Sequence, residues 1–372
     1  MTFGETPNPC RRNIPRLELS GAASQVQRLE RLGQWFDDLA ARETFNGAVW
    51  IAREGATLFA QHYGFADFAN GTPLTTRSSF SLASVSKQFT GMGILLLRQR
   101  GLLRLDDPLA KHIPELSFYA GVTLTHLLHH TSGLPDYGEF ADRNWDPARL
   151  LTQNDLITLL ATLRPQPYFA PGAQYEYSNT GYALLGEIIA RVSRTSFAAF
   201  MATEIFDPLH MRDSAAFNLS SPSCPLRERA FGFTRHGGGL DPVEACDLNN
   251  LDGTFGDGGI YASAADLVRW DAALREGRLL PADIYREAYA PGRLNDGRTV
   301  DYGFGWEIVA PHIVKHWGEW EGFSAYVWRN LEAHTLLVLL SNLGPPACVD
   351  AMTHDLDAFM QSLGSADSAP VG

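Results

Sequence analysis

The sequence predicts a mixed α/β (α+β) fold in which an antiparallel sheet is built from both ends of the chain. Strand-like segments occur at 46–52 and 58–64 and return between residues 302 and 340, where the run at 314–319 alternates. The residues between them, from about 85 to 266, show mainly helical spacing interrupted by Pro- and Gly-rich loops. This order predicts a mainly helical lobe inserted between two parts of one sheet.

The first elements are a helix and a strand pair. Residues 22–42 predict an amphipathic helix, since apolar side chains recur there at helical spacing: Val26, Leu29, Leu32, Trp35, Phe36 and Leu39. The strands at 46–52 and 58–64 are joined by a turn at Glu54-Gly55. In the helical part, residues 218–253 contain Gly237-Gly238-Gly239 and are expected to form a long surface excursion.

The last elements complete the sheet and cover it. Strand-like runs are followed by a closing helix at 347–363, and the strands are expected at 314–319, 324–328 and 335–340. We therefore expect one domain over residues 21–363 and a disordered tail at 364–372. The expected parts are an N-terminal extension (1–20), a sheet lobe (about 21–83 and 267–363) and a helical lobe (about 84–266).

Composition is that of a compact protein and excludes several classes of partner. The chain has 372 residues, of which 45% are hydrophobic, so it can bury a large core. Its net charge of -12, without a basic block, repels phosphate backbones and anionic lipid, so neither nucleic acid nor a membrane surface is expected as a partner. No metal or cofactor motif occurs, and the adjacent pair His129-His130 is expected to end a helix.

Location is inferred from the N-terminus and the cysteines. Residues 1–16 lack the apolar core of a signal peptide, which favours a cytoplasmic protein, or a periplasmic or secreted one if a leader has been removed. The four cysteines are too dispersed to indicate a disulfide framework: Cys10, Cys224, Cys246 and Cys348.

Ser84 and Lys87 are the first candidates for catalysis. They lie three residues apart, where a polar run gives way to the apolar helical run 89–97, so Lys87 can reach the Ser84 hydroxyl. A serine becomes a nucleophile when a base takes its proton, and a lysine acts as that base only if burial lowers its pKa. The structural alternative is a helix start in which Ser84 is the N-cap and Lys87 is solvated.

Two further segments add polar groups to the same candidate site. Tyr177 and Asn179 stand at a junction between a loop and a helix, where a packed aromatic and a helix cap are the alternative. His316-Trp317-Gly318 lies on a strand-like run, and a glycine in a strand often marks the close approach of a ligand or backbone. An edge-strand bulge is the alternative there.

Taken together and in this order, the three segments resemble the serine β-lactamase and penicillin-binding-protein superfamily, which is recognised by S-x-x-K, a Tyr-x-Asn element and a Lys-Thr-Gly-like strand. The forms found here look most like the class C branch, which includes esterases, D-amino-acid peptidases and acyltransferases. The resemblance covers roughly residues 22–362 and implies a β-lactamase/transpeptidase-like fold. It extends to other segments, among them 105–108, 127–135, 256–267 and 322–324.

The resemblance implies a role for each candidate residue. Ser84 is the expected nucleophile, and Lys87 and Tyr177 are expected to carry its proton, with the choice of general base left open. Asn179 is expected to orient Lys87 and to bind the substrate amide. The expected oxyanion donors are the backbone N–H groups of Ser84 and Glu319, the residue after Gly318.

The departures from the family pattern concern the substrate. Trp317 stands where lactam-binding members carry Thr or Ser, and His316 stands where the family usually has Lys. These changes favour a small, uncharged ester or amide over a carboxylated lactam, and a protonated His316 is expected to weaken that preference below pH 6. Four aromatic residues are candidate walls of the site, with a place in the hydrophobic core as the alternative: Tyr137, Trp317, Trp320 and Phe323. The loops 137–144 and 218–253 are expected to set specificity.

The expected function is therefore that of a serine hydrolase, esterase-like, acting through an acyl-enzyme without a metal or cofactor. An acyltransferase, a D-amino-acid peptidase or a β-lactamase on the same site is the alternative, and a non-catalytic binding protein on this fold is the second alternative. The α/β-hydrolase class is not supported, because the chain has no G-x-S-x-G nucleophile elbow. The sequence predicts no oligomeric state.

Overall fold

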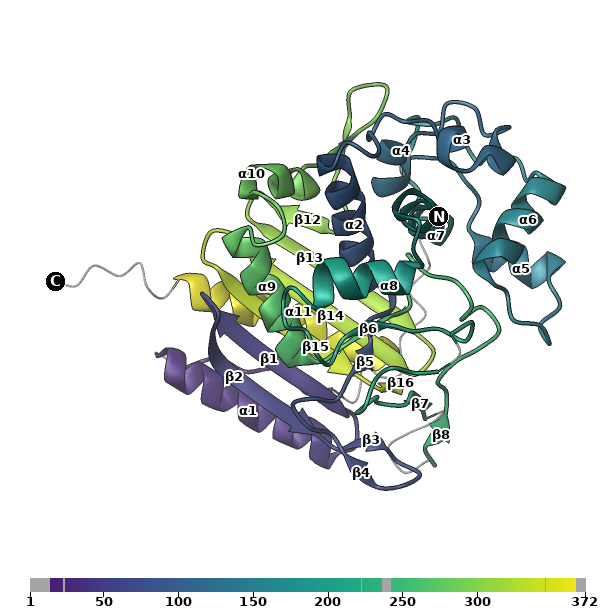
Figure 1. Cartoon of the computed structure of the whole chain (residues 1–372). Coiled ribbons are helices and arrows are strands. Elements are labelled where there is room, and N and C mark those ends of the chain that lie inside the picture. Colours follow the sequence, from purple (N-terminus) through teal and green to yellow (C-terminus); the bar gives the residue numbers. More distant parts are fainter. Residues whose placement is uncertain (1–13, 23, 222, 236–241, 345, 366–372) are drawn as a thin grey trace.

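A six-stranded antiparallel sheet forms the centre of the molecule, in the order β12-β13-β14-β15-β1-β2 (Figure 1). The computed structural model describes residues 14–22, 24–221, 223–235, 242–344 and 346–365. Strand β1 (Gly47–Arg53), from the N-terminal part, pairs along its whole length with β15 (Thr335–Ser341), from the C-terminal part. This confirms that the sheet is built from both ends of the chain. Its other strands are β2 (Ala56–Tyr63), β12 (Glu307–Ala310), β13 (Ile313–Trp320) and β14 (Phe323–Asn330).

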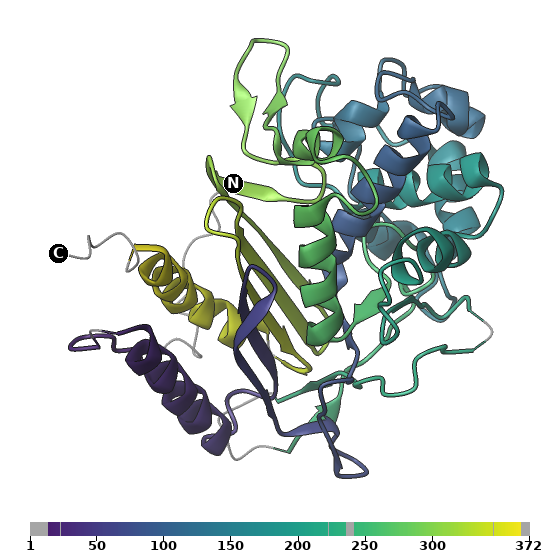
Figure 2. The same cartoon turned by 60° about the vertical axis from the view of Figure 1, so that its left-hand side comes forward.

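The two faces of the sheet belong to different cores. Successive side chains of a strand point to opposite faces, and on β14 Tyr326 packs in one hydrophobic cluster while the adjacent Val327 packs in the other. The first cluster is completed by helices α1 (Gln25–Ala41) and α11 (Pro346–Ser365), which lie on the same side of the sheet (Figure 2). The second cluster is completed by helices that include α2 (Lys87–Gln99) and α9 (Ala264–Glu276).

The chain ends differ slightly from the expected boundaries. Helix α11 continues to Ser365, so Gly364 belongs to a helix rather than to a tail, and residues 366–372 lie outside the described residues. Before α1, the side chains of Ile14, Leu17 and Leu19 pack against the cluster formed by α1 and α11. No helix of the described part has the length and apolar composition that crossing a membrane requires.

The helical part is organised around α2, whose residues from Lys87 to Leu97 are all buried, and α7 (Asn179–Ser193), which packs against it. Residues 137–144 were expected to form a loop, but they form helix α5 (Tyr137–Asn144). The helix begins here because the Asp136 side chain caps its first turn by accepting a hydrogen bond from Gly138 N. The other helices are α3 (Leu109–His112), α4 (Leu124–Leu128), α6 (Gln153–Leu163), α8 (Phe197–Met201), α10 (Ala282–Tyr285), the 3₁₀ turns η2 (Ala83–Ser86), η3 (Pro114–Leu116) and η5 (Arg286–Tyr289), and the π-helical η4 (Ala202–Phe206).

Short strands connect the helical part to the sheet. The segment 218–253 was expected to be a surface excursion, but it contains β7 (Phe233–Thr234) and β8 (Glu244–Ala245), which pair with each other. Its three consecutive glycines lie outside the described residues. The remaining short strands are β3 (Phe65–Asp67), β4 (Thr72–Pro73), β5 (Phe80–Ser81), β6 (Ala215–Ala216), β9 (Ile260–Ala262), β10 (Gly292–Arg293), β11 (Thr299–Val300) and β16 (Leu343–Gly344).

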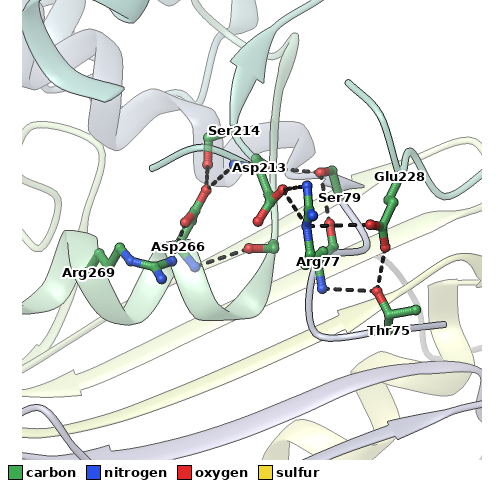
Figure 3. Close-up of polar contacts among 9 residues, drawn as sticks. Thr75, Arg77, Ser79, Asp213, Ser214, Glu228, Asp266 and Arg269 are labelled. Carbon is green, nitrogen blue, oxygen red and sulfur yellow. Dashed lines mark hydrogen bonds and ion pairs between the residues drawn. The ribbon is translucent and has the colours of Figure 1, made fainter. Parts of the chain in front are cut away.

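A polar network holds the segment that leads to Ser84 (Figure 3). Asp266, in the first turn of α9, is completely buried and accepts hydrogen bonds from Asp213 N and Ser214 Oγ, both at 2.8 Å. The side chain of Asp213 in turn accepts from Arg77, and its main-chain oxygen accepts from Ser79 Oγ. Because residues 77–79 immediately precede β5 and η2, the network ties the approach to Ser84 to helix α9.

Removing the buried carboxylate of this network is expected to destabilise the protein. Asp266→Ala leaves Asp213 N and Ser214 Oγ without their acceptor and removes the ion pair with the partly exposed Arg269. Each buried unsatisfied donor costs about 1–3 kcal/mol. We expect the free energy of unfolding to fall by at least about 2 kcal/mol, measured by urea denaturation. The matched control is Asp106→Ala, whose side chain is 69% exposed; it is expected to change stability by less than about 0.5 kcal/mol. Equal unfolding midpoints for the two variants would contradict a stabilising role of Asp266.

Candidate active site

Ser84 and Lys87 meet at the junction between η2 and α2. Ser84 lies in the 3₁₀ turn, where residues three apart eclipse one another, and Lys87 is the first residue of α2. The Lys87 Nζ atom is 2.9 Å from Ser84 Oγ. Ala83, just before Ser84, has a φ of 45°, a left-handed conformation that is strained for a residue with a side chain. Such strain is often concentrated at functional sites.

The Lys87 ammonium is fully buried and fully hydrogen-bonded. Its three donors reach Ser84 Oγ, Asn179 Oδ1 and the main-chain oxygen of Asp257, each at 2.9 Å. Burial lowers the pKa of Lys87 to about 8, although the carboxylates of Asp257 and Asp136 oppose this shift. A lysine with this pKa can exchange a proton with a serine near neutral pH.

Tyr177 and Asn179 approach Lys87 from the start of α7. Asn179 is the first residue of this helix, and Tyr177 precedes it by two residues, with its ring centroid 4.9 Å from Lys87 Nζ. Removal of its hydroxyl from water raises the pKa of Tyr177 well above its ordinary value, while a hydrogen bond to Ser84 opposes the shift. His130, a residue not expected at the site, packs its ring 4.3 Å from that of Tyr177 and accepts a hydrogen bond from Ser178 N.

Gly318 allows β13 to lie directly against η2. A Cβ atom at this position would lie 2.3 Å from the main-chain oxygen of Leu82 and 3.0 Å from Ser84 N, distances that no side chain can adopt without displacing the backbone. The glycine therefore brings the strand edge next to Ser84, which is the close approach that its position in a strand predicts.

The strand register turns the backbone of Glu319 towards Ser84. Trp320 pairs with Phe323 across a two-residue turn, and such a closing pair is hydrogen-bonded. Hydrogen-bonded and non-hydrogen-bonded pairs alternate, so Glu319, opposite Ser324, has its N–H directed away from β14. Strand β13 also packs against η2, which contains Ser84. The N–H groups of Ser84 and Glu319 thus come from facing backbone segments, as an oxyanion hole requires.

His316 lies next to the catalytic candidates but does not present a charge to a substrate. It is 1% exposed, its Nδ1 donates to the Trp317 oxygen at 2.6 Å, and its Nε2 accepts from the Tyr302 hydroxyl at 2.8 Å. Burial, together with the positive charge of Lys87, lowers the pKa of His316 to about 3. The expectation that a protonated His316 attracts a carboxylate below pH 6 is therefore wrong, because burial keeps the imidazole neutral until the pH approaches about 3.

A cleft opens beside Ser84 between the helical part and β13. It encloses about 780 Å³, counting the part open to solvent. Of the four aromatic residues expected as walls, Tyr137 and Trp320 line it, whereas Trp317 packs on the opposite face of the sheet and Phe323 is buried in the core. The cleft is lined by residues from both parts of the chain, including Ser81, Ser84, Asp136, Asn179, Phe217, Leu251, Asp252, Thr254, Asp257, Tyr261 and Glu319.

Asp136 and Asp257 are site residues that sequence reasoning did not single out. Asp136 accepts a hydrogen bond from Asn179 N at 2.7 Å, and Asp257 contributes its main-chain oxygen to Lys87. A local signal was available: Asp257 lies within the segment 256–267, which resembles the family, and Asp136 directly follows another such segment, 127–135. The contacts that make them important join residues far apart in the chain.

Comparisons with known proteins agree with this geometry. Residues 32–359 match the Beta-lactamase family. The chain is 37% identical over 317 residues to Penicillin-binding protein 4* of Bacillus subtilis (strain 168), a match that covers 82% of this chain and 70% of that protein. Among solved structures it is similar to the D-amino acid amidase from Ochrobactrum anthropi SV3, with a TM-score of 0.74 and 25% identity over 89% of this chain and 98% of that one. A penicillin-binding protein from Bacillus halodurans shares the fold, with a TM-score of 0.73.

The chain therefore belongs to the beta-lactamase family. It is a serine hydrolase of the superfamily that includes β-lactamases and penicillin-binding proteins, and it acts through an acyl-enzyme on amide or ester substrates. These findings confirm the resemblance, the fold class and the enzyme class expected from the three sequence segments.

Proposed function

We propose that Ser84 is the nucleophile of this hydrolase and that Lys87 and Tyr177 carry its proton. The contact of 2.9 Å between Ser84 Oγ and a completely buried Lys87 Nζ supports this assignment most strongly. Ser84 Oγ attacks the carbonyl carbon of a small ester or amide, and the Ser84 proton passes to neutral Lys87. The resulting oxyanion accepts hydrogen bonds from Ser84 N and Glu319 N, each worth about 2.7–4 kcal/mol in such sites.

The pKa shifts favour Lys87 over Tyr177 as the general base. Because the pKa of Lys87 is about 8, about one protein molecule in ten carries a neutral Lys87 at pH 7. This neutral amine can accept a proton. Tyr177, with its pKa raised well above 10, is a phenol at that pH and can only donate. Tyr177 is therefore suited to protonate the leaving group while it takes up the proton that Lys87 received from Ser84, and departure of the leaving group yields the acyl-enzyme. In the second half-reaction water attacks the acyl carbon and gives a proton to neutral Lys87. The proton that Tyr177 and Lys87 return to Ser84 Oγ releases the acid and restores the free enzyme.

A small, neutral or cationic substrate fits the cleft better than a carboxylated one. His316 is neutral and enclosed, so it supplies no cation for the carboxylate of a lactam or of a peptide C-terminus. The similar protein is a D-amino acid amidase, and we extend this activity to the present chain as a proposal for amide and ester bonds. We also propose that residues 21–363 act as one catalytic domain, because the cleft is lined from both the sheet and the helical parts.

Covalent labelling tests the proposed nucleophile. A fluorophosphonate is expected to add one phosphonyl group per chain, at Ser84, since Lys87 lowers the barrier to attack by this hydroxyl alone. Intact-protein mass spectrometry and peptide mapping measure the mass and the position of the label. Ser81 lines the same cleft, so Ser81→Ala is the matched control and should keep the label. Label on a serine other than Ser84 would refute the assignment.

A further inference from the structure

The cleft beside Ser84 is lined by acidic side chains. Asp136, Asp252, Asp257 and Glu319 line it, and none of the described residues that line it is Arg, Lys or His. Lys87 lies behind this lining with no exposed surface. The lining of the cleft therefore carries negative charge, which favours the binding of cationic substrates over anionic ones.

Asp257 contributes a carboxylate oxygen that has no donor. The residue is 8% exposed, and its Oδ2 atom accepts a hydrogen bond from the Tyr137 hydroxyl at 2.8 Å. Its Oδ1 atom is buried and has no hydrogen-bond partner among the described residues. Buried polar atoms are nearly always hydrogen-bonded, so an unpartnered acceptor in the wall of a cleft points to a donor on the ligand.

The neighbouring groups cannot supply that donor in this arrangement. The three N–H bonds of the Lys87 ammonium are directed to Ser84 Oγ, Asn179 Oδ1 and the main-chain oxygen of Asp257. The Tyr137 hydroxyl has one proton, which goes to Asp257 Oδ2. Neither Lys87 nor Tyr137 is therefore free to donate to Asp257 Oδ1.

Asp136 adds a second negative charge at the same end of the cleft. Its two oxygens are held by hydrogen bonds from Gly138 N and Asn179 N, so the carboxylate is fixed in place. Asp136 also interacts electrostatically with Asp257 and Lys87, since it raises the pKa of each. Burial raises the pKa of Asp257, while the Lys87 ammonium and the hydrogen bond from Tyr137 oppose this shift. An added cation with hydrogen-bond donors would favour the ionised carboxylate in the same way.

We propose that this cleft selects substrates with an ammonium group close to the scissile carbonyl, which donates a hydrogen bond to Asp257 Oδ1 and is attracted by Asp136. The inference rests on the proposed function and names its substrate class: amides and esters of amino acids, or similar compounds, with a free amine. Because Asp257 also binds Lys87 through its main-chain oxygen, an ammonium at its side chain lies within reach of a carbonyl placed at Ser84.

Three matched substrates test this selection on the wild-type protein. They are alanine p-nitroanilide, its N-acetyl derivative and its N-succinyl derivative, each as both enantiomers, which share a leaving group and differ in charge. At about pH 7 most of the free amine is protonated. We expect kcat/KM for the free amine to exceed that of the N-acetyl compound by about 10- to 100-fold, the range of a charge-assisted hydrogen bond. The N-succinyl anion is expected to be the poorest substrate.

The variants Asp257→Asn and Asp136→Asn test whether these two carboxylates cause the preference for the free-amine substrate. Each should lower the ratio of kcat/KM for the free amine to that for the N-acetyl compound, whatever happens to the absolute rates. Asp38→Asn is the matched control, since it removes the same charge from helix α1 on the other face of the sheet, and it should leave the ratio unchanged. Raising the salt concentration to about 0.5 M should lower the wild-type ratio as well, because salt screens partly exposed charges.

Binding to Ser84→Ala separates this inference from the proposed function. The same three compounds, titrated calorimetrically into this variant, should bind in the same order of affinity, since binding needs no acyl transfer. A wild-type protein that turns over none of them, with that order of affinity intact, would refute the proposed function and leave the ammonium site standing. A wild-type preference for the N-acetyl or N-succinyl compound would overturn the inference, and so would a free-amine preference that both Asn variants leave unchanged.

Discussion

Replacing Ser84 with alanine is expected to lower kcat/KM for an activated ester by at least about 10⁴-fold, because groups that act as one nucleophilic unit lose nearly all activity when the nucleophile is removed. The residual rate would come from the oxyanion donors and from substrate binding, which the substitution leaves in place. Lys87 retains its hydrogen bonds to Asn179 Oδ1 and to the Asp257 main-chain oxygen. The fold should therefore survive, and the loss should be one of chemistry.

Two measurements separate a chemical loss from a structural one. Ser84→Ala should unfold at the same urea concentration as the wild-type protein and should no longer be labelled by a fluorophosphonate. Ser81→Ala, in the same cleft, should keep most of the activity. If Ser84→Ala retained more than about a tenth of the wild-type kcat/KM, another residue would be the nucleophile.

The pair formed by Ser84 and Lys87 could be predicted from sequence because it is local. Residues three apart share a helix face whatever the rest of the chain does, and the 3₁₀ turn brings the two side chains to 2.9 Å. The sheet strands were predictable for a similar reason, since short runs of strand-forming residues bounded by turn signals are visible within a few residues. The expected strand at 46–52 became Gly47–Arg53, a shift of one residue.

The environment of His316 could not be predicted from local sequence patterns. Strand alternation indicates that His316 and Trp317 point to opposite faces, and the structure places them so. Alternation does not indicate that Tyr302 will enclose His316 and hydrogen-bond its Nε2 atom. A histidine on the correct face was therefore expected to titrate near pH 6, whereas burial keeps it neutral.

The acidic side chains that line the cleft were not predicted from the sequence, again because their role depends on long-range contacts. Asp136 and Asp257 lie more than a hundred residues apart, and both come from turns or caps where an aspartate has an ordinary local explanation. Their importance depends on long-range contacts. Asn179 N donates a hydrogen bond to the Asp136 carboxylate, and Lys87 Nζ donates one to the main-chain oxygen of Asp257. Charge at a substrate cleft is a property of the folded surface, and a single sequence does not contain it explicitly.

Replacing the proton carriers is expected to have the second-largest effect. Lys87→Ala and Tyr177→Phe should each lower kcat/KM by about 10²- to 10⁴-fold, the range for a lost general acid or base. Because the two groups move the same proton, the double variant should lose much less than the product of the two single losses. Lys315→Ala and Tyr175→Phe are the matched controls: Lys315 pairs with Asp357, and Tyr175 is an exposed neighbour of Tyr177.

The pH dependence identifies which of the two is the base. If neutral Lys87 accepts the Ser84 proton, kcat/KM for a neutral ester should fall as pH falls through about 8, the pKa to which burial lowers this lysine. Tyr177→Phe should keep this inflection at a lower rate. Lys87→Arg should abolish activity, since arginine retains its proton at every pH used. If the inflection disappeared in Tyr177→Phe and persisted in Lys87→Ala, Tyr177 would be the base and Lys87 would act only by stabilising its phenolate.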